Sequence, residues 1–359
     1  MLSKEGATTG VRSSRGGGYN RLVSSDFPRR RFLAAGAAAT ALAACSRWSS
    51  PAPEHGPIAA MFPGQIDDGG FIEAGYRGLM RVPDVLPMKV TYVDRIPPEA
   101  DAMKEALRGL AKSDAKMVIA FGGQTSEAAQ RVAWEFPEQR FTVIQGSLLR
   151  PNLAIYEVLQ EQSTWLAGAA AGMLTKTNVV GHMSGLRVRP GLKGRAAFAG
   201  GLAATNPRAK LLTNFSGTQD DAAVAKRIAL AQIDAGADII FTMLNAGRTG
   251  AIEACRERGV KQIGNVLDWV AVMPDVFVAS AVADGGFAIV QAARDLYDAI
   301  WTGDRTRRFG MRNPDAVRLV LAPGVPEPVK ARIALLTQEM IVGGIKIPEE
   351  YSGPEFTPA

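Results

Sequence analysis

The chain has 359 residues, of which 47% are hydrophobic and 21% charged, with 38 glycines, two cysteines and two histidines. This composition excludes an intrinsically disordered protein, a collagen-like protein and a disulfide framework. Two histidines also argue against a catalytic zinc site, which usually takes two or three imidazoles. The formal net charge of +6 is compatible with an anionic partner, so its distribution along the chain matters.

The positive charge is concentrated at the N-terminus. Residues 1–44 hold seven basic and two acidic residues, a net charge of +5, so the rest of the chain is close to neutral. The basic residues precede an apolar run from Phe32 to Cys45 that is too short to cross a bilayer. This order is typical of a secretory signal, and it removes the argument for a nucleic-acid partner.

Two short motifs refine this signal. Residues 29–33, RRRFL, resemble a twin-arginine export signal, and residues 42–45, LAAC, resemble a lipobox, at which Cys45 becomes the lipidated first residue. The acyl chains on one such cysteine suffice for a stable membrane anchor. We therefore expect a signal over residues 1–44, a lipidated tether over 45–57, and a protein anchored to a membrane facing the periplasm or the exterior.

From Ile58 onward, short apolar runs alternate with amphipathic stretches, which predicts an α/β protein with parallel sheets. The predicted strands, in chain order, are Ile58–Phe62, Lys89–Val93, Met117–Phe121, Phe141–Gln145, Val179–Met183, Lys210–Phe215, Asp238–Met243, Gln262–Val266, Val276–Val282 and Val317–Leu321. The predicted helices are Glu73–Val82, Pro98–Lys112, Thr125–Glu135, Thr164–Thr175, Leu192–Thr205, Asp220–Ala235, Thr249–Arg258, Gly285–Ile300 and Pro326–Met340.

These elements predict two doubly wound lobes with a ligand cleft between them. We expect residues 58–162 and about 283–325 in lobe 1, residues 163–282 in lobe 2, and residues 326–359 as a helix and tail crossing back over both. In open parallel sheets ligands bind beyond the carboxyl ends of the strands. Residues that directly follow each strand are therefore the candidates for ligand binding.

The same stretch of sequence offers no catalytic constellation. It contains no Walker A motif, no nucleophile elbow and no HExxH motif. His182 lies among apolar residues and is interpreted as a core histidine, and Cys255 as a buried small side chain. The acidic pairs at residues 67–68 and 220–221 favour helix capping over direct ligand contact. These features favour a binding protein over an enzyme.

Several segments resemble the basic membrane protein family, the purine-nucleoside-receptor-like lipoproteins of ABC transporters. The segments run in order along residues 58–350 and include IDDGGF at 66–71, AGYRGL at 74–79, WLAG at 165–168, GADIIF at 236–241 and GGIKIP at 343–348. The resemblance implies a type I periplasmic-binding-protein fold that closes on a purine nucleoside or base and passes it to a permease. In that family an aromatic side chain of the first loop stacks on the base, and Phe71 occupies the matching position.

The sequence departs from that pattern where the family places charged groups. Phe62 and Gln145 stand where acids end the first and fourth strands, and Val266 and Ala283 replace an acid and a lysine. Carboxylates and lysines would grip ribose hydroxyls and purine nitrogens through charge-assisted bonds. Their loss favours a smaller or less polar aromatic ligand, such as a free purine base.

We therefore predict a substrate-binding lipoprotein of an ABC importer, monomeric and without cofactor or metal. The predicted ligand-binding residues are Phe62, Asp68, Phe71, Gly123, Gln124, Gln145, Ser184, Asn245, Asp268 and Trp269. Two alternatives stay open: an envelope sensor that presents its ligand to a receptor, and, less favoured, a nucleoside hydrolase.

Overall fold

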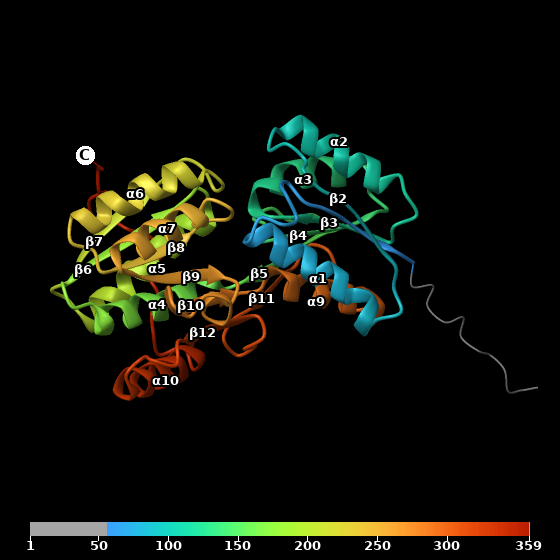
Figure 1. The fold of residues 1–359 in the computed structure, drawn as a ribbon. Helices are drawn as coiled ribbons and strands as arrows, with labels where there is room; N and C mark the ends of the chain where they lie inside the picture. The colour runs from blue at the N-terminus through green and yellow to red at the C-terminus, as the bar shows by residue number, and fades with distance from the viewer. Residues whose placement is uncertain (1–55, 359) are drawn as a thin grey trace, which may run out of the picture. The chain divides into compact units, whose positions relative to one another are not determined.

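The computed structural model describes residues 56–358. The predicted signal, Cys45 and nearly all of the tether lie outside these described residues. The described chain contains two six-stranded sheets flanked by helices (Figure 1). None of the helices within residues 56–358 is long and apolar enough to cross a membrane.

The first sheet is entirely parallel, with strand order β11-β5-β4-β3-β1-β2. Its inner strands are buried on both faces, as expected where helices cover both sides of a parallel sheet. Alternate residues of β1 point to opposite faces: Ala60 packs in the core under α1 and α9, and Met61 in the core under α2 and α3. The strands are β1 (Ile58–Met61), β2 (Val90–Val93), β3 (Met117–Phe121), β4 (Arg140–Ile144), β5 (Leu153–Val158) and β11 (Thr306–Phe309). The helices are α1 (Phe71–Val85), α2 (Ala100–Ala111), η1 (Gly123–Thr125), α3 (Ser126–Glu135) and α9 (Gly285–Tyr297).

The second sheet repeats this plan, with strand order β12-β10-β9-β8-β6-β7 and an antiparallel edge strand, β12. One face packs against α4 and α5, where Phe198 stacks on Phe241 at 4.7 Å between ring centroids. The other face packs against α6 and α7. The strands are β6 (Val179–Ser184), β7 (Lys210–Phe215), β8 (Ile239–Met243), β9 (Lys261–Val266), β10 (Phe277–Ala283) and β12 (Val317–Leu321). The helices are α4 (Gln160–Leu174), α5 (Arg189–Thr205), α6 (Ala222–Asp234), α7 (Arg248–Arg258), α8 (Trp269–Val272) and α10 (Glu327–Ile341).

Both sheets have the same switch in strand order. The first strand of each, β1 or β6, lies between the next two strands of its sheet, so the chain winds outward in both directions. Such a switch opens a crevice beyond the carboxyl ends of the central strands. The doubly wound α/β architecture predicted from the sequence is therefore confirmed.

The predicted strands are all present, but two further strands were not predicted. Strand β5 follows β4 after a short loop, within the residues expected in lobe 1 but in a stretch for which no strand was predicted. Strand β11 has the sequence TRRF, and its two arginines give it too few apolar residues to be predicted as a strand. These arginines are compatible with an edge strand because Arg307 pairs with Asp295 and Arg308 with Glu157.

The expected lobe boundaries need one correction. Residues 283–325 were expected in lobe 1, and α9 and β11 do pack with the first sheet. Strand β12, however, pairs with β10 over Ala279–Ala283, which places it in the second sheet. Within residues 56–358 the chain passes between the sheets three times, after β5, after β10 and after β11.

The close contact between α4 and α5 depends on glycine. A Cβ atom on Gly168 of α4 would lie 2.0 Å from the carbonyl oxygen of Phe198, and one on Gly201 of α5 would lie 1.8 Å from that of Trp165. The α4 and α5 backbones therefore touch directly. In contrast, a Cβ atom on Gly109 of α2 would meet no atom within 4 Å.

We predict opposite effects for two glycine-to-alanine changes in helices. Gly168→Ala forces α4 and α5 apart and should lower the free energy of unfolding by about 1–3 kcal/mol. Gly109→Ala fills open space and improves helix propensity, so it should raise that free energy by about 0.5–1 kcal/mol. Urea unfolding of both variants provides the measurement, and equal effects would contradict the direct contact between the backbones.

Candidate functional site

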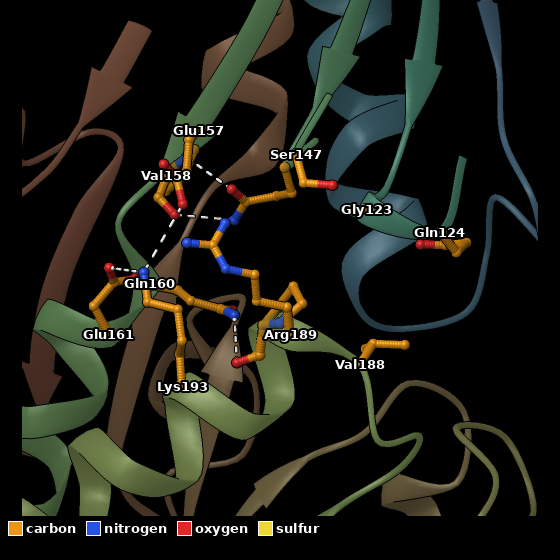
Figure 2. A pocket seen from close by; sticks show the side chains of 12 residues that line it. Gly123, Gln124, Ser147, Glu157, Val158, Gln160, Glu161, Val188, Arg189 and Lys193 are labelled. Atoms are coloured by element: carbon orange, nitrogen blue, oxygen red, sulfur yellow. Dashed lines mark hydrogen bonds and ion pairs between the residues drawn. The ribbon is translucent and has the colours of Figure 1, made fainter. Parts of the chain in front are cut away.

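A cavity of about 190 Å³ lies between the carboxyl ends of first-sheet strands and the start of α5 (Figure 2). This volume is more than ten times the roughly 15 Å³ that one water needs. The first sheet and its following loops contribute Gly123, Gln124, Gln145, Ser147, Glu157 and Val158, the start of α4 contributes Gln160 and Glu161, and the segment leading into α5 contributes Val188, Arg189, Pro190 and Lys193. The cavity thus lies beyond the carboxyl ends of β3, β4 and β5, beside the switch in strand order between β1 and β3, where open parallel sheets bind ligands.

Gln145 lies at the floor of this cavity and has an unusual backbone conformation. Its φ of 62° ends β4 and turns the side chain toward β5. There the amide Nε2 donates to the carbonyl oxygen of Val158 at 2.9 Å, while Oε1 accepts from the Val158 N–H at 3.1 Å. The Gln145 amide therefore extends the pairing of β4 with β5 and fixes the floor of the cavity.

The charged groups of the cavity are largely paired with each other. Lys193 Nζ lies 2.6 Å from Glu161 Oε1 and 3.9 Å from Glu157 Oε1. Glu157 also accepts from Arg308 Nε at 2.9 Å. The side chains of Glu157, Glu161 and Lys193 are only 12–14% exposed, so these pairs are better shielded from solvent than surface pairs.

Asp68 holds the loop that precedes α1. Its carboxylate accepts from the backbone N–H groups of Gly70 at 2.8 Å, Glu73 at 3.0 Å and Ile72 at 3.2 Å. Burial raises the pKa of Asp68, while these three hydrogen bonds oppose that rise. This contact is the helix-capping role favoured by the sequence, and it uses both carboxylate oxygens.

The same loop touches the end of β8 in the second sheet. The Phe71 N–H donates to Asn245 Oδ1 at 3.2 Å, and a Cβ atom on Gly70 would lie 2.5 Å from the same oxygen. The Phe71 ring lies against Phe121, with centroids 4.4 Å apart. Phe71 and Asn245 therefore form a direct contact between the two sheets' loops, beside the strand that leads into Gly123.

Arg248 supports the second-sheet side of this contact. It is fully buried and donates to the carbonyl oxygens of Leu244 and Asn265 and to the Asn265 side chain. Its guanidinium lies 4.5 Å from the ring centroid of Trp269. Burial lowers the pKa of Arg248, yet an arginine stays charged at neutral pH. Sequence reasoning missed this residue because an arginine in the first turn of a helix reads as a surface residue.

The ten residues predicted to bind ligand lie in three settings. Gly123, Gln124 and Gln145 line the cavity. Asp68, Phe71, Asn245 and Trp269 belong to the loop contact, and Asp268 caps α8 by accepting from Ala271 N at 3.3 Å. Phe62 and Ser184 are buried, and Phe62 packs edge-on against Tyr76 and Tyr92 and tilted against Phe121.

The cavity residues Glu157, Gln160, Glu161 and Lys193 were not predicted. Glu157, Gln160 and Glu161 lie in β5 or just after it, and because β5 was not predicted as a strand, its carboxyl end offered no candidates. Lys193 lies in α5 and reaches the cavity from the other side. The signal was nevertheless present, because residues 153–156, LAIY, form a short apolar β-rich run.

The described residues offer little for metal binding or nucleophilic chemistry. Residues 56–358 contain no cluster of three histidine, cysteine or acidic side chains that could hold a metal ion. Cys255 is fully buried, and burial raises the pKa of its thiol to about 12, which keeps it protonated and unreactive at neutral pH.

The C-terminal tail packs near the cavity's second-sheet wall. The Phe356 N–H donates to the carbonyl oxygen of Thr213 at 2.9 Å. Glu355 pairs with Arg195 at 2.5 Å and with Arg187, which directly precedes the cavity residue Val188. The two arginines lower the pKa of Glu355. The tail thus ties the loop before α5 to the edge strand β7.

We predict that Glu355→Gln loosens this tail. The substitution keeps the side-chain size but removes the charge that pairs with Arg187 and Arg195. Hydrogen exchange at the Phe356 amide should become about fivefold faster, the equivalent of about 1 kcal/mol. The exposed Glu350→Gln serves as the control, and equal exchange in both variants would show that the ion pairs do not hold the tail.

His182 lies in the core of the second half, as its sequence context indicates. Nδ1 is 2.8 Å from Thr213 Oγ1, and the buried Nε2 has no hydrogen-bond partner among residues 56–358. Burial lowers the pKa of His182 to about 3. The unfolded chain, with an ordinary histidine pKa near 6.5, therefore binds the proton more readily than the folded protein does.

This shift predicts a loss of stability in acid. As pH falls from about 6.5 toward 3, His182 should cost the folded protein up to about 1.4 kcal/mol per pH unit. A His182→Gln variant, which has no proton to gain, should lose stability less steeply than the wild type over this range. Urea unfolding from pH 4 to 8 measures the difference, and parallel curves would contradict the prediction.

The chain is similar in sequence to a known family of proteins. A model of the ABC transporter substrate-binding proteins described as PnrA-like matches residues 57–350. A purine-binding protein of Brucella abortus is 23% identical over 267 residues, which cover 74% of each chain.

Solved structures agree on the fold. A solute-binding protein of an ABC transporter from Aeropyrum pernix matches with a TM-score of 0.72 and 18% identity, covering 81% of this chain and 92% of that one. A counterpart from Conexibacter woesei matches with a TM-score of 0.67 and 23% identity, covering 82% and 98%.

The family consists of solute-binding proteins that work outside the cytoplasmic membrane, and it is not an enzyme family. The resemblance to the basic membrane proteins and the predicted type I periplasmic-binding-protein fold are therefore confirmed. Because the family model matches nearly all of the described residues, the chain belongs to the PnrA-like family of ABC transporter substrate-binding proteins.

Proposed function

We propose that this protein captures a purine base, a purine nucleoside or a similar small aromatic molecule and delivers it to an ABC permease. The observation that carries the proposal is the cavity at the carboxyl ends of the first sheet, closed on its other side by the start of α5 (Figure 2). A ligand there contacts both halves of the described chain at once.

A ligand in this position can control how closely the two sides of the cavity approach each other. A ligand that contacts both sides binds better when they are close together, so it shifts the population toward the closed arrangement. The hydrogen bond from Phe71 to Asn245 joins loops from the same two sides. This contact would add to the closed state without consuming the cavity's own polar groups.

The chemistry of the cavity supports a neutral, partly apolar ligand. Val158, Val188 and Pro190 supply apolar surface, and the carboxylates of Glu157 and Glu161 are already paired with Lys193. The name of the Brucella abortus relative supports a purine among such ligands. We include Phe71 as an aromatic contact, because its half-buried ring lies beside the strand that leads into the cavity.

We further propose that the protein is exported by the twin-arginine pathway and held at a membrane by lipid on Cys45. The arginine-rich start, the apolar run and the lipobox-like LAAC stand in the order that this route requires. An anchor would keep the protein close to its permease.

We predict that a soluble form comprising residues 46–359 binds purines. Calorimetric titration should show dissociation constants below high micromolar for at least one of adenine, guanine, hypoxanthine, adenosine and inosine. Substituting Gln145 with alanine should weaken that binding about tenfold or more, because it removes the two hydrogen bonds that fix the cavity floor.

A matched control is Gln338→Ala, which alters an exposed glutamine of α10 away from the cavity. Failure of all five purines, together with tight binding of a sugar or an amino acid, would show that the purine assignment is wrong.

A further inference from the structure

The hydrogen-bonding groups of the cavity divide into paired and unpaired ones. The Gln145 amide is taken by Val158, and Gln160 Nε2 donates to the carbonyl oxygen of Pro190 at 3.1 Å. Glu157 and Glu161 are taken by Lys193, with Arg308 as a further partner of Glu157. These groups build the cavity walls and are poorly placed to choose between ligands.

Arg189 differs from these paired groups of the cavity. Its side chain is exposed, and within residues 56–358 it takes part in no ion pair or hydrogen bond. Figure 2 shows its guanidinium extending from the start of α5 across the cavity toward Glu157 and Val158. Other polar groups of the lining without a partner among the described residues are the exposed side chains of Gln124 and Ser147, the amide oxygen of Gln160 and one carboxylate oxygen of Glu161.

Arg189 therefore supplies the largest set of free hydrogen-bond donors on any one side chain of the cavity. An arginine offers five N–H donors in a rigid fork and no acceptor. The first turn of α5, where Arg189 lies, adds unpaired backbone N–H groups and the positive end of a helix dipole. A ligand that presents two adjacent acceptors fits this environment better than one that presents a donor.

We propose that Arg189 makes the cavity selective for 6-oxopurines, such as hypoxanthine and inosine, over the corresponding 6-aminopurines. This inference rests on the proposed purine-binding function. A 6-oxopurine presents O6 and N7 as neighbouring acceptors, and arginine pairs with both at once, as it does with guanine in DNA. Adenine places an N6 amino donor beside N7, so the same fork meets one acceptor and one repelling donor.

The test compares matched ligand pairs that differ at position 6. Hypoxanthine and adenine, and inosine and adenosine, are titrated calorimetrically into residues 46–359 of the wild type and of Arg189→Gln. In the wild type the 6-oxo member of each pair should bind at least about tenfold more tightly. In Arg189→Gln the ratio should fall close to one, because a glutamine amide can donate to O6 or accept from N6.

Two further variants separate the fork from its charge. Arg189→Lys keeps the charge without the fork, so its selectivity should fall between those of the wild type and Arg189→Gln. Arg208→Gln changes the charge by the same amount at an exposed position after α5 and should keep the wild-type ratio.

The outcomes distinguish this inference from the function on which it rests. Purine binding with equal affinity for both members of each pair, or a ratio unchanged in Arg189→Gln, overturns the role of Arg189 and leaves purine binding intact. Absence of binding by these four purines and by guanine overturns both. Tighter binding of inosine monophosphate than of inosine would overturn the selectivity for O6 and N7 by showing that Arg189 pairs with an anion.

Discussion

The rest of the structure depends on one constraint: in each sheet the first strand of the chain pairs in parallel with the two strands that follow it in the sequence, one on each side. β1 pairs with β2 on one side and β3 on the other, and β6 pairs in the same way with β7 and β8. Helices must then cover opposite faces of each sheet, and the loops after the central strands diverge. The cavity residues Gly123 and Gln124 and the contact residue Asn245 all lie in such loops.

This constraint explains how much of the fold could be predicted from the sequence. Strands such as Met117–Phe121 are buried along their whole length, so they read as continuous apolar runs between turn residues. β11 was missed because its arginines are acceptable only beside Asp295 and Glu157, which lie elsewhere in the sequence. The position of β12 depends on its antiparallel pairing with β10, which no local pattern encodes.

The candidate site was less predictable than the fold. Strand-end reasoning led to Gly123, Gln124 and Gln145, but it could not show that the Gln145 amide pairs with the backbone of Val158. It also treated Phe62 as a possible ligand contact, whereas the ring packs into an aromatic cluster with Tyr76, Tyr92 and Phe121. Side-chain direction at a strand end depends on neighbouring strands, and only the assembled sheet determines it.

The distribution of charge along the sequence bears on what the cavity can recognise. Most of the formal +6 belongs to residues 1–44, so the remaining chain has little net charge with which to attract an anion over a long distance. Among the charged groups of the cavity, Glu157 and Glu161 pair with Lys193, and Glu157 also pairs with Arg308 outside the lining. Recognition must then depend on short-range complementarity, where hydrogen-bond direction discriminates more sharply than charge does. A near-neutral protein with one unpaired donor fork in its cavity is suited to neutral ligands that differ in a single donor or acceptor.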